Sequence, residues 1–512
     1  MSPSRMSKLV TTTATAAEPL PGLENSYAAL PEQFYARVAP TPVAAPEMLR
    51  VNRALAEQLG LDPDVLASDD GVATLAGNRV PRGATPLAMA YAGHQFGHFV
   101  PSLGDGRAVL LGERVDRDGR RWDIQLKGAG QTPFSRSGDG RAVLGPVIRE
   151  YVLGEAMAGL GIPTTRALAM VATGEPVYRE RIEPGAVLIR VAASHIRVGT
   201  FEYFARRGDR DAVRRLADYV IARHYPDCAD DEAPYPSLLG AIAARQGELI
   251  ARWLLVGFIH GVMNTDNMAL SGETIDYGPC AFIDDYHPNT VYSSIDHGGR
   301  YAYGKQPSIG MWNLTQLASC LLPLLSDELE TGKDLARTAL DRYAERFNAT
   351  YTEGLRAKIG LTDARDGDDE LVQDLLGRMA EHGADFTNCF RLLCDLPADA
   401  DAGSAVQDQL RALFRDPAAF DDWAERWRRR VAEQPMPDAD RGAVIRLVNP
   451  AYIPRNHRVQ QVIDAATEDG DLSPLDALLR VVSRPFDDHD DMAEYRRPPR
   501  PEEVVQRTFC GT

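Results

Sequence analysis

Residues 260–267 read HGVMNTDN, and the tripeptide Asp276-Tyr277-Gly278 follows nine positions after Asn267. An apolar stretch leads into each segment, so both are expected to lie between buried elements. Asn267 and Asp276 offer an amide and a carboxylate oxygen on either side of a short turn at 271–273. Hard oxygen donors in this arrangement suit a Mg²⁺ ion that bridges nucleotide phosphates, with turn or capping roles as the plainer alternative.

The same stretch resembles the catalytic loop of small-molecule kinases, His-Gly-Asp-x-x-x-x-Asn, with one difference. In that loop the residue two positions after the histidine is the base, and here that residue is Val262. An aspartate, Asp266, lies beside Asn267 instead. The sequence leaves three interpretations open: a non-catalytic nucleotide-binding scaffold, a phosphotransferase with an unusual base, or different chemistry that uses Asp266.

A Gly-rich segment precedes the loop in the chain. Residues 104–113 (GDGRAVLLGE) and 121–127 (RWDIQLK) flank an Arg-Asp-Gly turn, which predicts a β-hairpin. Apolar and polar residues alternate in the second strand, so Lys127 is expected on its polar face. The first strand begins in a turn whose backbone N–H groups could approach phosphate oxygens, although such a turn is often only a turn. The candidates there are Gly104, Gly106 and Arg107.

Lysine is rare in this chain, since only five of the 56 basic residues are lysines. Lysine differs from arginine in its compact ammonium group, so a position that keeps lysine in this chain favours a functional role, here for Lys127. A helix is expected over residues 146–159, with Glu150 early in it. A strand lysine paired with a helix glutamate is the device by which kinases position phosphates.

Two arginines follow in and after a strand expected over residues 187–192. Arg190 lies in that strand and Arg197 comes seven residues later. Two guanidinium groups directed at one anion would matter in an acidic protein. Because arginine is abundant here, the sequence alone leaves their role open.

Composition excludes several classes of protein. The net charge of −17 argues against a nucleic-acid surface, because such binding neutralises phosphates with basic residues. No apolar run is long enough to span a bilayer, so no membrane association is expected. Six scattered cysteines indicate neither a zinc site nor a disulfide framework, which favours a reducing cytoplasm. The first 17 residues faintly resemble a mitochondrial transit peptide, but a disordered Ser/Thr/Ala tail is the favoured interpretation.

Several long blocks of the chain resemble the selenoprotein O family. They are YAGHQFGHFVPSLGDGRAVLLGE (91–113), DIQLKGAGQTPFSRSGDGRAVL (123–144), IREYVLGEAM (148–157), GVMNTDNM (261–268) and TIDYGPCAFIDDY (274–286). The likeness runs from about residue 25 to the C-terminus. That family has a protein-kinase-like fold and acts as a protein adenylyltransferase, which moves AMP from ATP to Ser, Thr or Tyr hydroxyls of other proteins.

The resemblance implies a role for each residue singled out above. It assigns Gly104, Gly106 and Arg107 to the phosphate loop, Lys127 and Glu150 to an ion pair, Asp139, Gly140, Arg190 and Arg197 to the nucleotide, Asp266 to proton acceptance, and Asn267 and Asp276 to Mg²⁺ or Mn²⁺. It also implies an inverted ATP, with the γ-phosphate buried and the α-phosphorus facing the acceptor. Asp266 could instead orient the metal from outside its coordination shell.

The resemblance also implies an α+β fold with a protein-kinase-like two-lobed core, an N-terminal extension and a mostly helical C-terminal region. The expected parts are a disordered tail (1–20), the N-terminal extension with a helix near 46–60 (21–100), an N-lobe (101–205), a C-lobe (206–330) and the helical C-terminal region with a cysteine-containing tail (331–512).

Two further features stay open. Cys510 occupies the position at which animal members of the family carry selenocysteine, and the resemblance implies a disulfide to a cysteine near the activation segment, for which Cys280 is the nearby candidate. His94 and His98 have the i, i+4 spacing of metal ligands on a helix. No third ligand lies near them in the sequence, so structural packing is favoured.

Overall fold

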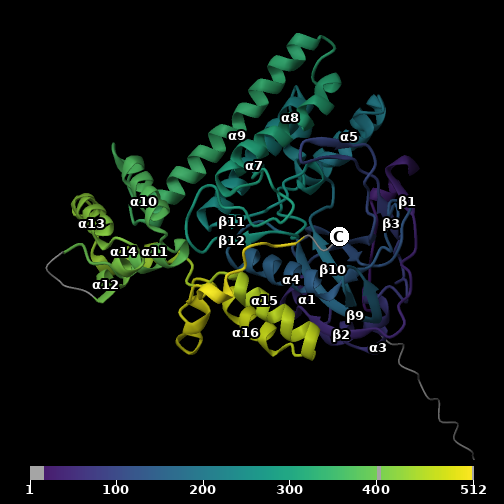
Figure 1. The fold of residues 1–512 in the computed structure, drawn as a ribbon. Coiled ribbons are helices and arrows are strands. Elements are labelled where there is room, and N and C mark those ends of the chain that lie inside the picture. The colour runs from purple at the N-terminus through teal and green to yellow at the C-terminus, as the bar shows by residue number, and fades with distance from the viewer. Residues whose placement is uncertain (1–16, 400–404, 510–512) are drawn as a thin grey trace, which may run out of the picture.

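The structure is a computed structural model that describes residues 17–399 and 405–509 (Figure 1). It combines helices with antiparallel strands, which confirms the predicted α+β class. The central sheet has eight strands in the order β1-β3-β6-β7-β10-β9-β2, and β8 pairs with β10. These strands are β1 (Tyr35–Arg37), β2 (Glu47–Val51), β3 (Leu87–Met89), β6 (Ala108–Val115), β7 (Arg121–Lys127), β8 (Ala142–Val143), β9 (Arg166–Tyr178) and β10 (Ile182–Ala192). Two small two-stranded sheets complete the strands: β4 (Gly93–Gln95) with β5 (His98–Val100), and β11 (Phe258–Ile259) with β12 (Ala281–Phe282).

The predicted hairpin is formed by β6 and β7, whose register pairs Ala108 with Lys127. Ile124 and Leu126 are fully buried in one core. This core lies against the short helices α1 (Arg53–Gln58), α2 (Pro63–Leu66) and α3 (Asp69–Leu75). Alternation places Lys127 on the other face of the sheet, as the sequence predicted.

The predicted helix with Glu150 is α4 (Leu144–Gly159), which packs on β9 and β10. Most of α4 is buried, including Glu150 itself. A carboxylate in such a position requires charged or hydrogen-bonding partners. Those partners define the site described below. Two further helices later in the chain are α6 (Arg210–His224) and α7 (Pro234–Leu255).

The helix predicted near residues 46–60 is wrong in its first half. Residues 47–51 form β2, which pairs with β9 more than a hundred positions later. Only residues 53–58 are helical, beginning after Asn52, whose side chain accepts a hydrogen bond from the Leu55 N–H. Pairing with a distant strand overrides the local helix preference of this stretch.

Residues 38–46, VAPTPVAAP, form a link between the two edges of the sheet, since β1 lies at one edge and β2 at the other. The Thr41 N–H donates to the Ala129 carbonyl just beyond β7, and the Ala45 N–H donates to Thr173 in β9. Three prolines keep this link extended. The N-terminal section thus supplies both edge strands of the sheet. Leu20, at the end of the expected disordered tail, is fully buried, and residues 1–16 lie outside the described residues.

The described part of the C-terminal region is helical, as predicted. Its helices are α9 (Leu329–Lys358), α10 (Asp368–His382), α11 (Phe386–Leu392), α12 (Ala405–Ala412), α13 (Pro417–Val431), α14 (Asp438–Arg446), α15 (Asn456–Asp464) and α16 (Ser473–Val482). Figure 1 shows α9 beside α7 and α8 (Gln306–Leu325), away from the sheet. The chain then returns, and α15 and α16 pack on α4. Within the described residues, no helix is both long and apolar enough to cross a membrane.

Candidate functional site

A cleft of about 600 Å³ lies between the sheet and the segment 262–279. It brings together residues that are far apart in the sequence. It is lined by all the residues to which the resemblance assigns a role with nucleotide, metal or proton: Gly104, Gly106, Arg107, Lys127, Asp139, Gly140, Glu150, Arg190, Arg197, Asp266, Asn267 and Asp276. A cleft of this size is large enough for a nucleotide.

The Gly-rich turn at the start of β6 forms one wall of the cleft. Gly104 has φ +70°, and a Cβ there would lie 2.3 Å from the Phe134 ring. Two hydroxyl groups stabilise the turn. The Thr132 hydroxyl donates to the Asp105 carbonyl at 2.7 Å, and the Ser135 hydroxyl donates to the Gly106 carbonyl at 2.5 Å. Glycine is therefore required both by conformation and by the close approach of Phe134.

Lys127 and Glu150 form the expected ion pair, with 2.5 Å between Lys127 Nζ and Glu150 Oε2. The other carboxylate oxygen of Glu150 accepts from Arg190 Nε at 2.7 Å. Burial would raise the pKa of Glu150, but Arg190 and Lys127 lower it below its usual value. Glu150 therefore holds two cations at the floor of the cleft.

Three cationic side chains contact the carboxylate of Asp276. Its Oδ1 accepts from Arg190 Nη2 at 2.7 Å, and its Oδ2 accepts from Arg197 Nη1 at the same distance. Lys127 Nζ lies 3.5 Å from Oδ1. Burial alone would raise the pKa of Asp276, but the three cations hold it well below the usual range. Its backbone is also left-handed, with φ +62°, a conformation that is rare for non-glycine residues and common at functional sites.

Arg197 connects the loop that carries Asp266 with the loop that carries Asp276. Besides Asp276, its Nη1 donates to the Asp266 carbonyl at 2.8 Å, and its guanidinium lies 4.8 Å from the Tyr91 ring centroid. Its Nε is buried without a hydrogen-bond partner in the described chain. Unsatisfied buried polar atoms are uncommon in folded proteins, and a bound ligand is one explanation for them.

Asp266 is a buried acid on the loop at 264–267. Burial raises its pKa to about 6, although Gln95 and Arg197 act in the opposite direction. Gln95 Nε2 donates to its Oδ2 at 3.2 Å, while its Oδ1 has no hydrogen-bond partner among the described residues. General-base catalysis is most effective when the pKa of the base lies near the working pH. The raised pKa of Asp266 therefore suits it to accept a proton.

The donors for a metal are few but suitable. Asn267 Nδ2 donates to the Val262 carbonyl at 3.0 Å, so the amide oxygen is the atom that could coordinate an ion. No group of three or more His, Cys, Asp or Glu side chains within the described residues could hold a metal. One amide and one carboxylate oxygen fit Mg²⁺ because that ion usually takes its remaining ligands from phosphates and water. Asp276 and Asn267 therefore fit a metal shared with a nucleotide.

Comparison with known proteins agrees with this geometry. Residues 22–483 match the family described as "Protein adenylyltransferase SelO". The chain is 62% identical over 489 residues to a protein nucleotidyltransferase YdiU of Rhodopseudomonas palustris (strain BisB5), which covers 96% of this chain and 99% of that protein. A protein nucleotidyltransferase YdiU of Bradyrhizobium sp. (strain ORS 278) is 62% identical over the same shares. This chain belongs to the SelO family. It is a nucleotidyltransferase, and the resemblance stated from the sequence is confirmed.

In this SelO-family chain Asp139 lies at the rim of the cleft and is bound by Arg179, with contacts of 2.8 and 2.9 Å. Gly140 has φ +70°, and a Cβ there would lie 2.1 Å from the Gly130 backbone. Both residues therefore shape the rim. Their role in nucleotide binding stays a prediction.

The two histidines are not on a helix. His94 is in β4 and His98 in β5, so they lie on adjacent strands of a hairpin. His94 is buried, and its Nδ1 lies 2.5 Å from Glu202 Oε1 in α5 (Val198–Ala205), whereas His98 is exposed. The structural interpretation of His94 agrees with this placement.

Cys280 is fully buried, four residues after Asp276. Cys510 lies outside the described residues, so their pairing stays a prediction. The described chain does bring Thr508 to this region, because its hydroxyl donates to the Pro279 carbonyl at 2.6 Å. The C-terminal segment thus lies against the loop that carries Asp276 and Cys280.

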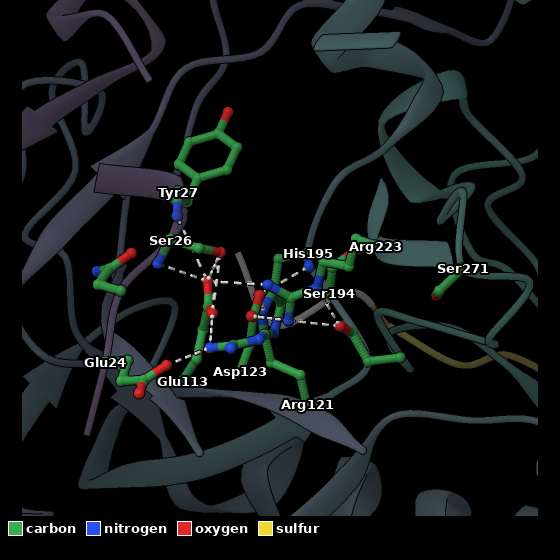
Figure 2. A network of polar contacts seen from close by, with 12 residues as sticks. Glu24, Ser26, Tyr27, Glu113, Arg121, Asp123, Ser194, His195, Arg223 and Ser271 are labelled. Atoms are coloured by element: carbon green, nitrogen blue, oxygen red, sulfur yellow. Dashed lines mark hydrogen bonds and ion pairs between the residues drawn. The ribbon is translucent and has the colours of Figure 1, made fainter. Parts of the chain in front are cut away.

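A second polar network, which the sequence did not predict, continues along the same face of β7 (Figure 2). Arg223 Nη2 donates to Asp123 at 2.6 Å, and its Nη1 lies 2.8 Å from Glu113. Asp123 also accepts from the backbone N–H of His195 at 3.0 Å, two residues before Arg197. The buried network therefore fixes the segment from which Arg197 reaches into the cleft.

Proposed function

We propose that this protein transfers AMP from ATP to Ser, Thr or Tyr hydroxyls of protein substrates, on a protein-kinase-like two-lobed core. The observation that carries the proposal is the cluster of Lys127, Arg190 and Arg197 at the floor of one cleft, around Asp276. Kinases position phosphates with the Lys-Glu pair. Two additional buried arginines supply the charge for a phosphate that lies deeper than in a kinase.

The nucleotide is inverted in this proposal. The β- and γ-phosphates lie among the three cations, and the α-phosphorus faces the acceptor. The acceptor oxygen forms a bond to the α-phosphorus while the bond from that phosphorus to the bridging oxygen breaks. Pyrophosphate leaves, and the hydroxyl proton passes to Asp266. A Mg²⁺ or Mn²⁺ ion bound by Asn267 and Asp276 would supply neutralisation of phosphate charge.

One observation favours each competing function. Val262 occupies the position of the usual kinase base, which is compatible with a scaffold that binds nucleotide without catalysis. The Lys127–Glu150 pair is equally compatible with ordinary phosphotransfer.

An experiment with ATP labelled at different phosphates distinguishes the three functions. The protein is incubated with a mixture of candidate protein acceptors and ATP labelled at either the α- or the γ-phosphate. We expect α-label, and no γ-label, on protein. Transfer of γ-label would indicate phosphotransfer, and the absence of both labels, with ATP binding retained, would indicate a scaffold.

We further propose that Cys280 and Cys510 form a redox pair. The contact between Thr508 and Pro279 supports it, since each residue is close in sequence to one of the cysteines. Oxidised wild-type protein and the Cys280→Ser variant are compared by non-reducing electrophoresis, with reduced samples as controls. We expect a mobility shift on oxidation that the variant loses. The same shift in the variant would exclude this pairing.

A further inference from the structure

The hairpin of β4 and β5 lies directly against the carboxylate of Asp266. Gln95 donates to Oδ2, and a Cβ added to Gly93 would lie 2.6 Å from Oδ1. One strand of the N-terminal section therefore contacts both oxygens of the proposed proton acceptor. Gln95 also lines the cleft, where it is half-buried.

Three consecutive residues of the loop are bonded to this hairpin. Besides Asp266, the Thr265 hydroxyl accepts from the His94 N–H at 2.6 Å. The Asn264 side-chain oxygen accepts from the Phe96 N–H at 3.1 Å. The hairpin and the loop are thus held in register, although they are about 170 positions apart in the chain.

A buried carboxylate fixes this register. Glu202 Oε1 lies 2.5 Å from His94 Nδ1, and Glu202 Oε2 accepts a short hydrogen bond from the Thr265 hydroxyl. The Glu202 side chain is 1% exposed, so loss of either partner would leave part of a buried carboxylate unsatisfied. The turn adds rigidity, since Phe96 and Gly97 both have positive φ, as in the tight turns of two-residue hairpins.

We propose that the β4–β5 hairpin is the positioning element for Asp266, with Gln95 orienting its carboxylate and the His94–Glu202–Thr265 bonds holding hairpin and loop in register. The inference rests on the proposed function, in which Asp266 receives the proton of the acceptor hydroxyl. A displacement of about 1 Å in such a group lowers the rate about 10²-fold. Gln95 acts through Asp266 and contributes little to ATP binding.

The first test is a double-mutant cycle of Gln95→Met and Asp266→Asn, measured as α-label transfer. Methionine keeps the length of glutamine but removes its hydrogen bonds. We expect Gln95→Met to lower kcat about 10- to 100-fold, with the KM for ATP unchanged within about twofold. We expect no further loss when Gln95→Met is added to Asp266→Asn, because the two side chains act as one unit. Gln461→Met, at an exposed position of α15, serves as the matched control.

The second test uses Thr265. Thr265→Ser keeps the hydroxyl and should retain most of the transfer rate, whereas the isosteric Thr265→Val should lose it to a similar extent as Gln95→Met. Equal rates for these two variants, or independent losses in the double-mutant cycle, would overturn the positioning role. Absence of α-label transfer by the wild-type protein would instead overturn the proposed function itself. Thermal unfolding with ATP identifies variants that fail to fold.

Discussion

Asp276→Asn is expected to abolish AMP transfer, with a loss of at least about 10²- to 10³-fold in kcat, as when one group that stabilises transition-state charge is removed. Asparagine preserves the shape of the side chain but removes the charge through which Asp276 would hold the metal with Asn267. It also leaves Arg190 and Arg197 without a carboxylate that each contacts at 2.7 Å.

In the absence of metal, the same substitution should leave ATP binding at least as strong as in the wild-type protein. In the wild-type protein the carboxylate competes with phosphate for the three cations, and the variant removes this competitor. We therefore expect ATP alone to raise the melting temperature of Asp276→Asn at least as much as that of the wild type. Asp118→Asn, in the exposed β6–β7 turn, is the control. Undiminished transfer by Asp276→Asn would overturn the metal assignment.

Asp266→Asn is expected to lower kcat about 10²- to 10⁴-fold, the usual contribution of general-base catalysis, with little change in the KM for ATP. The variant keeps the size of the side chain and the Arg197 contact, because that contact is to the backbone carbonyl. The measurement is the initial rate of α-label transfer at saturating ATP.

A titration with Mg²⁺ distinguishes the two roles of Asp266. Additional Mg²⁺ cannot take over the role of a missing proton acceptor. If Asp266 is the base, the rate of Asp266→Asn should therefore stay low at all Mg²⁺ concentrations. Recovery at high Mg²⁺ would show that Asp266 orients the metal from outside its coordination shell, and the assignment as base would then be wrong.

Local patterns predicted the elements that carry the cations. Alternation placed Lys127 on the cleft-facing side of β7, and helical spacing placed Glu150 in α4. The rarity of lysine was informative for Lys127 but not specific, since Lys358 is also buried, where it donates to Asn449 at 2.8 Å in the helical C-terminal region. A rare residue type thus indicates an unusual environment and not necessarily a site.

Contacts between distant segments could not be predicted in the same way. The strand at 47–51 is defined by its pairing with β9, and its own residues suggested a helix. Gln95 and Asp266 are 171 positions apart, and Glu202 is 63 positions from Thr265. No periodicity links such residues. The one available signal was their neighbour His94, whose lack of a third metal ligand already favoured a structural role.

The proline-rich link between β1 and β2 constrains the order in which the sheet can be completed. Six strand spacings separate the two edges, about 29 Å at 4.8 Å each, and ten residue steps in polyproline conformation span about 31 Å. In that conformation the link has little slack, and the edge strands at its two ends pair with inner strands that come from later parts of the chain. Such non-local closure slows folding. Removal of two residues would shorten the reach in this conformation to about 25 Å, which should weaken the pairing of one edge strand.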